Sequence, residues 1–89
     1  MAKVVITHAV EDVERWLGGK DVRAAAIGSV GASNVTDHVA ADGSNNIAVT
    51  AETSDVEAVK AMVASPPADI MESMQAHGVV PPISVYVEA

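Results

Sequence analysis

Three side chains that could carry chemistry lie within nine residues near the start of the chain: His8, Asp12 and Trp16. An imidazole with an ordinary pKa of about 6.5 can exchange a proton at neutral pH, so His8 is a candidate general base. Alternatively, His8 only forms a hydrogen bond at a strand end. Asp12 could orient His8, but its position also suits the N-cap of a helix. Trp16 is either a core residue or the wall of a ligand pocket.

A second set of candidates lies on predicted strands. His38, Thr50 and Tyr86 share the polar face of the sheet predicted below. A phenol and an imidazole on one face can act as an acid–base pair or bind a carbonyl group, or they can belong to a subunit interface. We predict a site at this face, or at its edge with the first helix. The expected catalytic residues are His8, His38 and Tyr86. The expected substrate contacts are Trp16, Asp12 and Thr50.

Motifs for a cofactor or a metal are missing from the sequence. It contains no Cys, no phosphate-binding loop and no nucleophile–base motif. Asp37 and His38 are adjacent, so on a strand they point to opposite faces and cannot hold one metal together. His77 precedes Gly78 at a predicted helix end, where a cation is favoured, which indicates a capping role. We therefore expect neither a cofactor nor a metal.

The composition predicts one domain over residues 1–89. Hydrophobic residues make up 49% of the chain, but most are Ala and Val, and there is no Phe. A core of small side chains buries little apolar area, so a chain of this length is only marginally stable alone. We therefore expect the chain to bury further surface by forming a homodimer.

The charge pattern limits the classes of partner. The net charge is -7, and the five Lys and Arg residues are scattered, so no basic stripe is available for a nucleic-acid backbone. No apolar run approaches the roughly 20 residues of a membrane span, and no signal peptide is apparent. The absence of Cys suits a reducing compartment. We expect a cytoplasmic protein without a nucleic-acid or membrane partner.

Hydrophobic periodicity predicts four strands and two helical segments. Strands are expected over 3–9, 33–41, 46–52 and 83–88. A helix over 12–27 is expected to break at Gly18-Gly19. The second helical segment begins near Ser54, which has capping-box spacing to Glu57, and breaks at Pro66-Pro67 before it ends at Gly78.

The order β-α-β-β-α-β predicts an α+β, ferredoxin-like fold: a four-stranded antiparallel sheet with the helices on one face. Alternation assigns Ile47, Val49 and Val85 to the helix-packed face. Ile70, Met71 and Met74 are expected to face the core from the last helix. The first strand is apolar on both faces, so a one-residue shift in its register decides which face His8 occupies.

The spacing His8-x-Val10-x-Asp12-x-x-x-Trp16 after a hydrophobic strand resembles small proteins of the dimeric α+β barrel superfamily. This group includes the antibiotic-biosynthesis monooxygenase and stress-responsive barrel domains. The segment Met74-Gln75-Ala76-His77-Gly78-Val79 before the last strand is similar to the same group. The resemblance implies two ferredoxin-like subunits whose sheets close into a shared barrel. It places ligands between each sheet and its helices, or inside the barrel.

The resemblance implies a function only broadly, because members oxygenate polycyclic phenols without a cofactor, cyclise polyketides, degrade haem or isomerise lactones. Oxygenases and haem-degrading members use an Asn near the first strand with a Trp and a His elsewhere. Here position 7 is Thr and Trp16 lies on the first helix, which disfavours haem breakdown.

Two functions remain open. The first is a small cofactor-independent oxygenase- or cyclase-like protein that acts on a small hydrophobic carbonyl or phenolic compound. The alternative is a non-catalytic dimeric module that binds a ligand or is associated with stress. An enclosed pocket that holds His8, or His38 with Tyr86, would favour the enzyme. A cleft filled by Met and Val side chains would favour the module.

Overall fold

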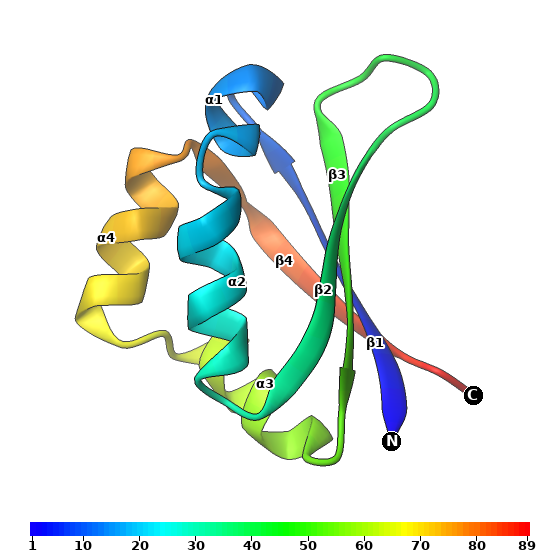
Figure 1. The fold of residues 1–89 in the computed structure, drawn as a ribbon. Coiled ribbons are helices and arrows are strands. Elements are labelled where there is room, and N and C mark those ends of the chain that lie inside the picture. Colours follow the sequence, from blue (N-terminus) through cyan, green and yellow to red (C-terminus); the bar gives the residue numbers. More distant parts are fainter.

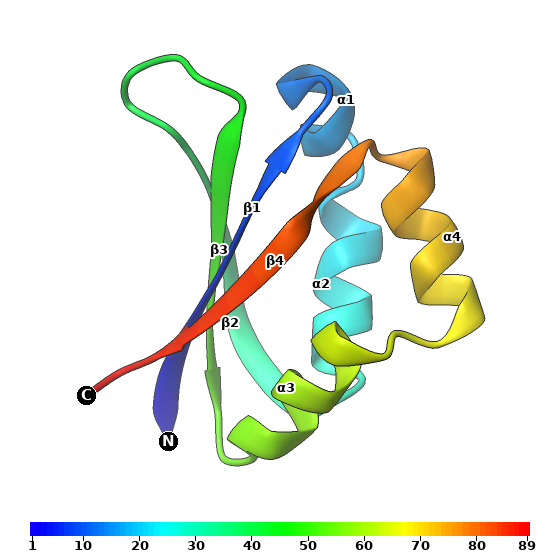
Figure 2. The same cartoon turned by 180° about the vertical axis from the view of Figure 1, so that it is seen from behind.

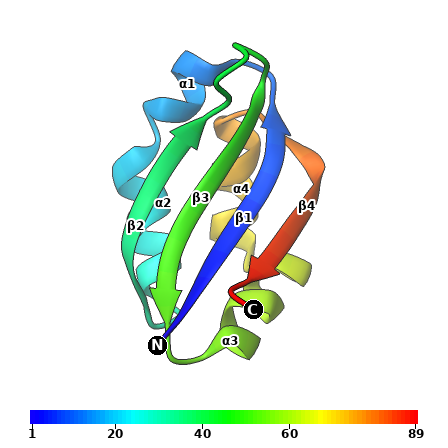
Figure 3. The same cartoon turned by 90° about the vertical axis from the view of Figure 1, so that its right-hand side faces the viewer.

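An antiparallel sheet forms one layer of the molecule in the computed structural model, which describes residues 1–89. Four strands lie side by side in the order β2-β3-β1-β4 (Figure 3). Their bounds are β1 Ala2–Val10, β2 Ala32–Val39, β3 Asn46–Thr53 and β4 Val79–Val87. Strand β1 is therefore central, whereas β2 and β4 form the two edges.

Four helices form the second layer, and all cover the same face of the sheet (Figures 1 and 2). Their bounds are α1 Val13–Leu17, α2 Lys20–Gly28, α3 Val56–Ala64 and α4 Ala68–Ala76. The predicted α+β, ferredoxin-like order with helices on one face is confirmed. None of these helices is long and apolar enough to cross a membrane.

The first helical segment is in two pieces, as the glycine pair predicts. Asp12 is the N-cap of α1, and its carboxylate accepts a hydrogen bond from the Arg15 backbone N–H at 3.2 Å. Helix α1 ends at Leu17, and Gly19 is the N-cap of α2. The predicted capping role of Asp12 is confirmed.

The second helical segment differs from the prediction at its start. Asp55, not Ser54, caps α3: its carboxylate accepts from the Ala58 backbone N–H at 3.0 Å. The predicted capping box at Ser54 is therefore wrong, because an Asp in the next position accepts the same kind of bond. Helix α4 ends as expected, since Gly78 follows the C-cap residue with a φ of 72°.

Strand β4 begins four residues earlier than predicted, at Val79 instead of Ile83. Val79 and Val80 already pair with Val10 and Ala9 of β1. The prolines at 81 and 82 do not exclude a strand here, because an edge strand leaves one row of backbone groups without a sheet partner. The pairing between β1 and β4 is irregular between Thr7 and Ala9.

The register of β1 places His8 on the helix side of the sheet. Strand β1 pairs with β3 without interruption, so that Ile6 lies opposite Val49 and His8 lies opposite Ile47. Both β3 residues are buried beneath the helices. Side chains alternate along a strand, so Ile6 and His8 share that face.

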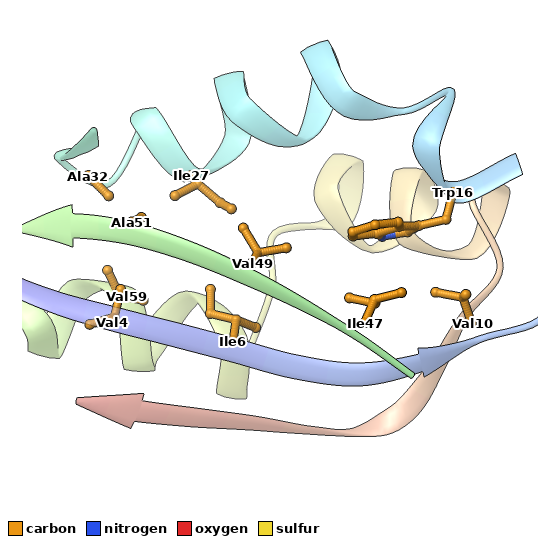
Figure 4. Packing of buried hydrophobic residues seen from close by; sticks show 10 residues of the cluster. All are labelled: Val4, Ile6, Val10, Trp16, Ile27, Ala32, Ile47, Val49, Ala51 and Val59. Carbon is orange, nitrogen blue, oxygen red and sulfur yellow. The ribbon is translucent and has the colours of Figure 1, made fainter. Parts of the chain in front are cut away.

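Trp16 is the largest fully buried side chain of the core. It lies between α1 and the sheet, above Ile47 and Val10 (Figure 4). The rest of the buried cluster consists of Val, Ile and Ala side chains. Helix α4 contributes no fully buried residue, and Met71, which was expected in the core, is 41% exposed.

Replacing Trp16 tests this packing. We expect Trp16→Ala to lower the free energy of unfolding by about 3 kcal/mol or more, as large-to-small core substitutions do. The matched control is Leu17→Ala on the same short helix, where the side chain is 36% exposed and the expected loss is smaller. Urea unfolding followed by circular dichroism measures both. A loss of a few tenths of a kcal/mol for Trp16→Ala would contradict the assigned packing.

Candidate functional site

A cavity of about 480 Å³ lies between the helix face of the sheet and α2, α3 and α4. Thirteen of its 19 lining residues are hydrophobic. The polar lining residues are His8, Arg23, Ser29, Asp69, Ser73 and His77. This volume and this mixture of an apolar wall with a few polar groups are typical of small-molecule sites.

The cavity opens between α2 and α4. Among its lining residues, the solvent-exposed ones are Val22, Ala25, Ser29 and Asp69. The first three belong to α2 and its C-cap, and Asp69 lies in the first turn of α4. The floor is formed by buried side chains, including Ile6 of β1 and Val49 of β3. The open side of the cavity is therefore formed by the two helices and its closed side by the sheet.

His8 is half-buried in the floor of this cavity. Its Nδ1 lies 2.8 Å from the Ala9 carbonyl oxygen. Because a carbonyl only accepts, Nδ1 carries the proton and donates it. The neutral ring then has an unprotonated Nε2 that can accept a proton.

The surroundings of His8 favour this neutral ring. Burial lowers its pKa below the ordinary value of 6.5, and the positive charge of Arg23 acts in the same direction. The hydrogen bond to Ala9 partly opposes these two effects. His8 therefore remains neutral at pH 7, with Nε2 as a base.

Trp16 forms the wall beside His8. The two rings meet edge to face, with centroids 6.3 Å apart and an interplanar angle of 84°. The Arg23 guanidinium covers the indole, with its central carbon 3.8 Å from the ring centroid. The indole N–H is buried and has no hydrogen-bond partner. Both sequence interpretations of Trp16, core residue and pocket wall, therefore apply.

An ion pair holds Arg23 in this position. Its Nε and Nη2 atoms donate to the two carboxylate oxygens of Asp37 at 3.0 and 2.8 Å, and its Nη1 donates to the Trp16 carbonyl at 3.1 Å. The side chains of Arg23 and Asp37 are only 13% and 4% exposed. A bidentate pair of this kind fixes both the position and the orientation of the guanidinium.

His77 adds a second imidazole to the cavity wall. Its ring rests on Gly19, since a Cβ atom at position 19 would lie 2.6 Å from His77 Cε1. Its Nδ1 lies 3.4 Å from Ser73 Oγ. The side chain that caps the end of α4 is Arg15, which donates to the carbonyls of Ala76 and Gln75 at 2.8 and 3.1 Å. The sequence interpretation of His77 as only a capping group is therefore incomplete.

The structure does not bring His8, His38 and Tyr86 together. Tyr86 pairs with Val5, whose neighbours Val4 and Ile6 are buried under the helices, so Tyr86 lies on the open face and is 60% exposed. The expectation of one shared site on the open face is therefore wrong in its geometry. The reason is the register of β1, which directs His8 to the helices.

His38 also lies on the open face of the sheet. Its Nε2 lies 3.0 Å from Thr50 Oγ1 on the neighbouring strand β3. The adjacent Asp37 points the other way, toward α2, as the alternation of a strand predicts. Asp12 is exposed at the start of α1 and does not line the cavity. Of the predicted site residues, only His8 and Trp16 line it.

Sequence reasoning missed three polar residues of the site region: Arg23, Asp37 and His77. One signal was present, because Asp37 shares a strand face with Val35 and Val39. A carboxylate on an otherwise apolar face requires a buried partner. Arg23 was one of only five basic residues that could supply it. The described side chains contain no group of three or more His, Cys, Asp or Glu residues that could hold a metal ion.

Comparisons with solved structures find the same fold in several bacterial proteins. Three of them have the provisional name of antibiotic biosynthesis monooxygenase. The protein from Bordetella bronchiseptica superposes with a TM-score of 0.65 at 16% identity, over 99% of this chain and 94% of the other. The Nitrosomonas europaea protein gives 0.60 at 11% identity, over 100% and 97%. The Deinococcus radiodurans protein gives 0.57 at 14% identity, over 100% and 92%.

These likenesses establish the α+β fold that the sequence resemblance implies. No model of a protein family matches the sequence, and no curated protein matches it.

The lowered pKa of His8 predicts a dependence of stability on pH. The unfolded chain binds a proton at His8 at a pH of about 6.5, and the folded chain binds it at a lower pH. Between these values the unfolded state binds more protons, so the free energy of unfolding decreases as the pH falls. His8→Gln should lack this component. Urea unfolding of the parent and of His8→Gln between about pH 7.5 and 5 measures this pH-dependent part of the free energy of unfolding. A difference between the two proteins that stays constant over this range would contradict the prediction.

Proposed function

We propose that this chain, which shares the α+β fold of the antibiotic biosynthesis monooxygenase-like proteins, binds a small hydrophobic phenol or enolisable ketone in its cavity and removes a proton from it. The single observation that carries the proposal is the half-buried imidazole of His8 in the floor of an apolar cavity. The Nδ1–H donates to Ala9, so Nε2 is the basic atom. A base of this kind matches the chemistry of weakly acidic O–H and C–H groups.

The surroundings of His8 support this role. The Arg23 guanidinium lines the cavity; Asp37 offsets part of its charge, and the positive potential that remains lowers the energy of a developing phenolate or enolate. Apolar lining residues lower the local dielectric constant and so strengthen this interaction. Removal of the proton gives an electron-rich carbon. Such a carbon can attack a carbonyl of the same molecule, as in cyclisation, or react with dioxygen, as in oxygenation.

We also propose that two copies associate through the open faces of their sheets. This face carries no helix (Figure 3). Tyr86 is 60% exposed there, and it lies beside Val5 of the central strand. A second sheet would cover these apolar groups and would find hydrogen-bonding partners in His38 and Thr50. In this proposal His38, Thr50 and Tyr86 belong to the subunit interface, and no substrate reaches them from the cavity.

The association is tested by mass in solution. At micromolar concentration, sedimentation equilibrium should give twice the 9.1 kDa mass of the chain. Tyr86→Glu should weaken the dimer, because it places a charge in the covered face. Glu72→Gln serves as a control at an exposed position of α4, in the helix layer and away from the open face. A monomer at these concentrations would overturn the association and leave the cavity proposal unaffected.

The base is tested by proton exchange. The probe is 2-tetralone, a two-ring ketone that enolises, with exchange of its α-hydrogens for deuterium followed by proton NMR. The parent should accelerate this exchange, and His8→Gln should lose about a hundredfold of the acceleration. The rate should rise with pH through the lowered pKa of His8 and should level off by about pH 6.5, since the neutral ring is the base.

The matched control is His38→Gln, which removes an imidazole from the opposite face and should leave the exchange rate within about twofold. Binding is followed separately by the fluorescence of Trp16, the only Trp of the chain. Equal rates for the parent and His8→Gln would overturn the role of His8. Binding of 2-tetralone without accelerated exchange would support the non-catalytic module in place of the enzyme.

A further inference from the structure

Helix α4 is the one helix of the four with no fully buried side chain. The other three each insert one: Trp16 from α1, Ile27 from α2 and Val59 from α3. Arg15 holds the carboxyl end of α4 through two backbone carbonyls. The middle of α4 is therefore supported only by half-buried side chains, including Ile70 and Met74.

A second cavity lies on the other side of α4. It has a volume of about 560 Å³ and lies against α3, α4 and the edge strand β4. Seven of its 11 lining residues are hydrophobic. Lys60 and Gln75 are exposed residues of its lining, and Lys60 also forms an ion pair with Glu57 at 3.3 Å. The space beneath α4 is thus incompletely filled on both sides of the helix.

The two cavities share a wall made only of apolar side chains. Four residues line both of them: Val63, Met74, Val79 and Ile83. All four are half-buried, and none carries a side-chain hydrogen-bonding group other than the weakly accepting thioether of Met74. Methionine is unbranched and changes its rotamer readily, so this wall can open without loss of a polar contact.

We propose that the ligand of the first cavity carries an unbranched apolar chain that passes beneath α4, between Met74 and Ile83, into the second cavity. This inference rests on the proposed function, because the phenol or ketone head group lies at His8. The apolar wall specifies the chemistry of the chain, since a polar or charged segment would lose its hydration there without a partner. The bound chain completes the packing under α4.

The affinity of a homologous series tests the inference. The probes are 4-ethyl-, 4-butyl- and 4-hexylphenol, with binding measured by Trp16 fluorescence. Each added methylene group that becomes buried should tighten binding by about fourfold. The hexyl compound should therefore bind about a hundredfold or more tightly than the ethyl compound. Affinity that stops rising beyond the ethyl compound would overturn the inference and leave a compact ligand for the first cavity.

Two variants test the path of the chain. Met74→Phe and Ile83→Phe each add bulk to the shared wall, and each should reduce the hexyl-to-ethyl affinity ratio to below about tenfold. The control is Leu17→Phe, a partly exposed position that lines neither cavity and should keep the parent ratio. Circular dichroism confirms folding of each variant. A parent-like ratio in both wall variants would overturn the path.

Amide hydrogen exchange provides a measurement that needs no substitution. The hexyl compound should slow exchange in α4 more than the ethyl compound does, because only the longer chain packs beneath the helix. Protection of α4 that grows with protein concentration in the absence of a phenol, without a matching gain in the sheet strands, would show that a second copy fills the second cavity, and would overturn the inference. If chain length matters but the 2-tetralone exchange is unaffected by His8→Gln, the proposed base fails while the binding path stands.

Discussion

The ion pair between Arg23 and Asp37 fixes α2 against the sheet beside the first cavity. It joins α2 to the edge strand β2, and both side chains are largely buried. Arg23 also stacks on Trp16, the largest core side chain. The ion pair therefore also fixes the group that packs against one face of the indole. Removing one partner of such a pair typically costs about 3–5 kcal/mol, since the other charge stays buried without compensation. The pair thus links the packing of α2, the position of Trp16 and the electrostatic environment of His8.

The cavity follows from the composition of the chain. Valine and alanine are well suited to a sheet face and to helix contacts, but they do not reach far across the space between layers. Trp16 fills this space at one end, beneath α1 (Figure 4). No comparable side chain fills it beneath α4, where the cavities lie. The order of elements thus defines the layers, whereas the sizes of the side chains define where cavities remain between them.

Local patterns in the sequence were sufficient for the fold and insufficient for the site. Period-2 alternation, the glycine pair and the proline pair marked the strands and the breaks of both helical segments. The face of His8 could not be read locally, because β1 is central and carries apolar residues on both faces. Its pairing with β3 decided the question by placing Ile47 opposite His8. The Arg23–Asp37 ion pair could not be predicted from local patterns either, because its two residues belong to different elements.

The two adjacent glycines at the helix break are constrained for different reasons. At Gly18 an added methyl group would lie 3.3 Å from the Arg15 carbonyl oxygen, which is a tight contact with its own helix. At Gly19 the backbone dihedral φ of -92° is available to any residue, so the glycine is not required by the chain conformation. A side chain there would instead meet the His77 ring, which would have to move from its place. The bare main chain at Gly19 therefore leaves room for the imidazole of His77. Gly19 does not line the cavity, yet its missing side chain lets His77 form part of the cavity wall.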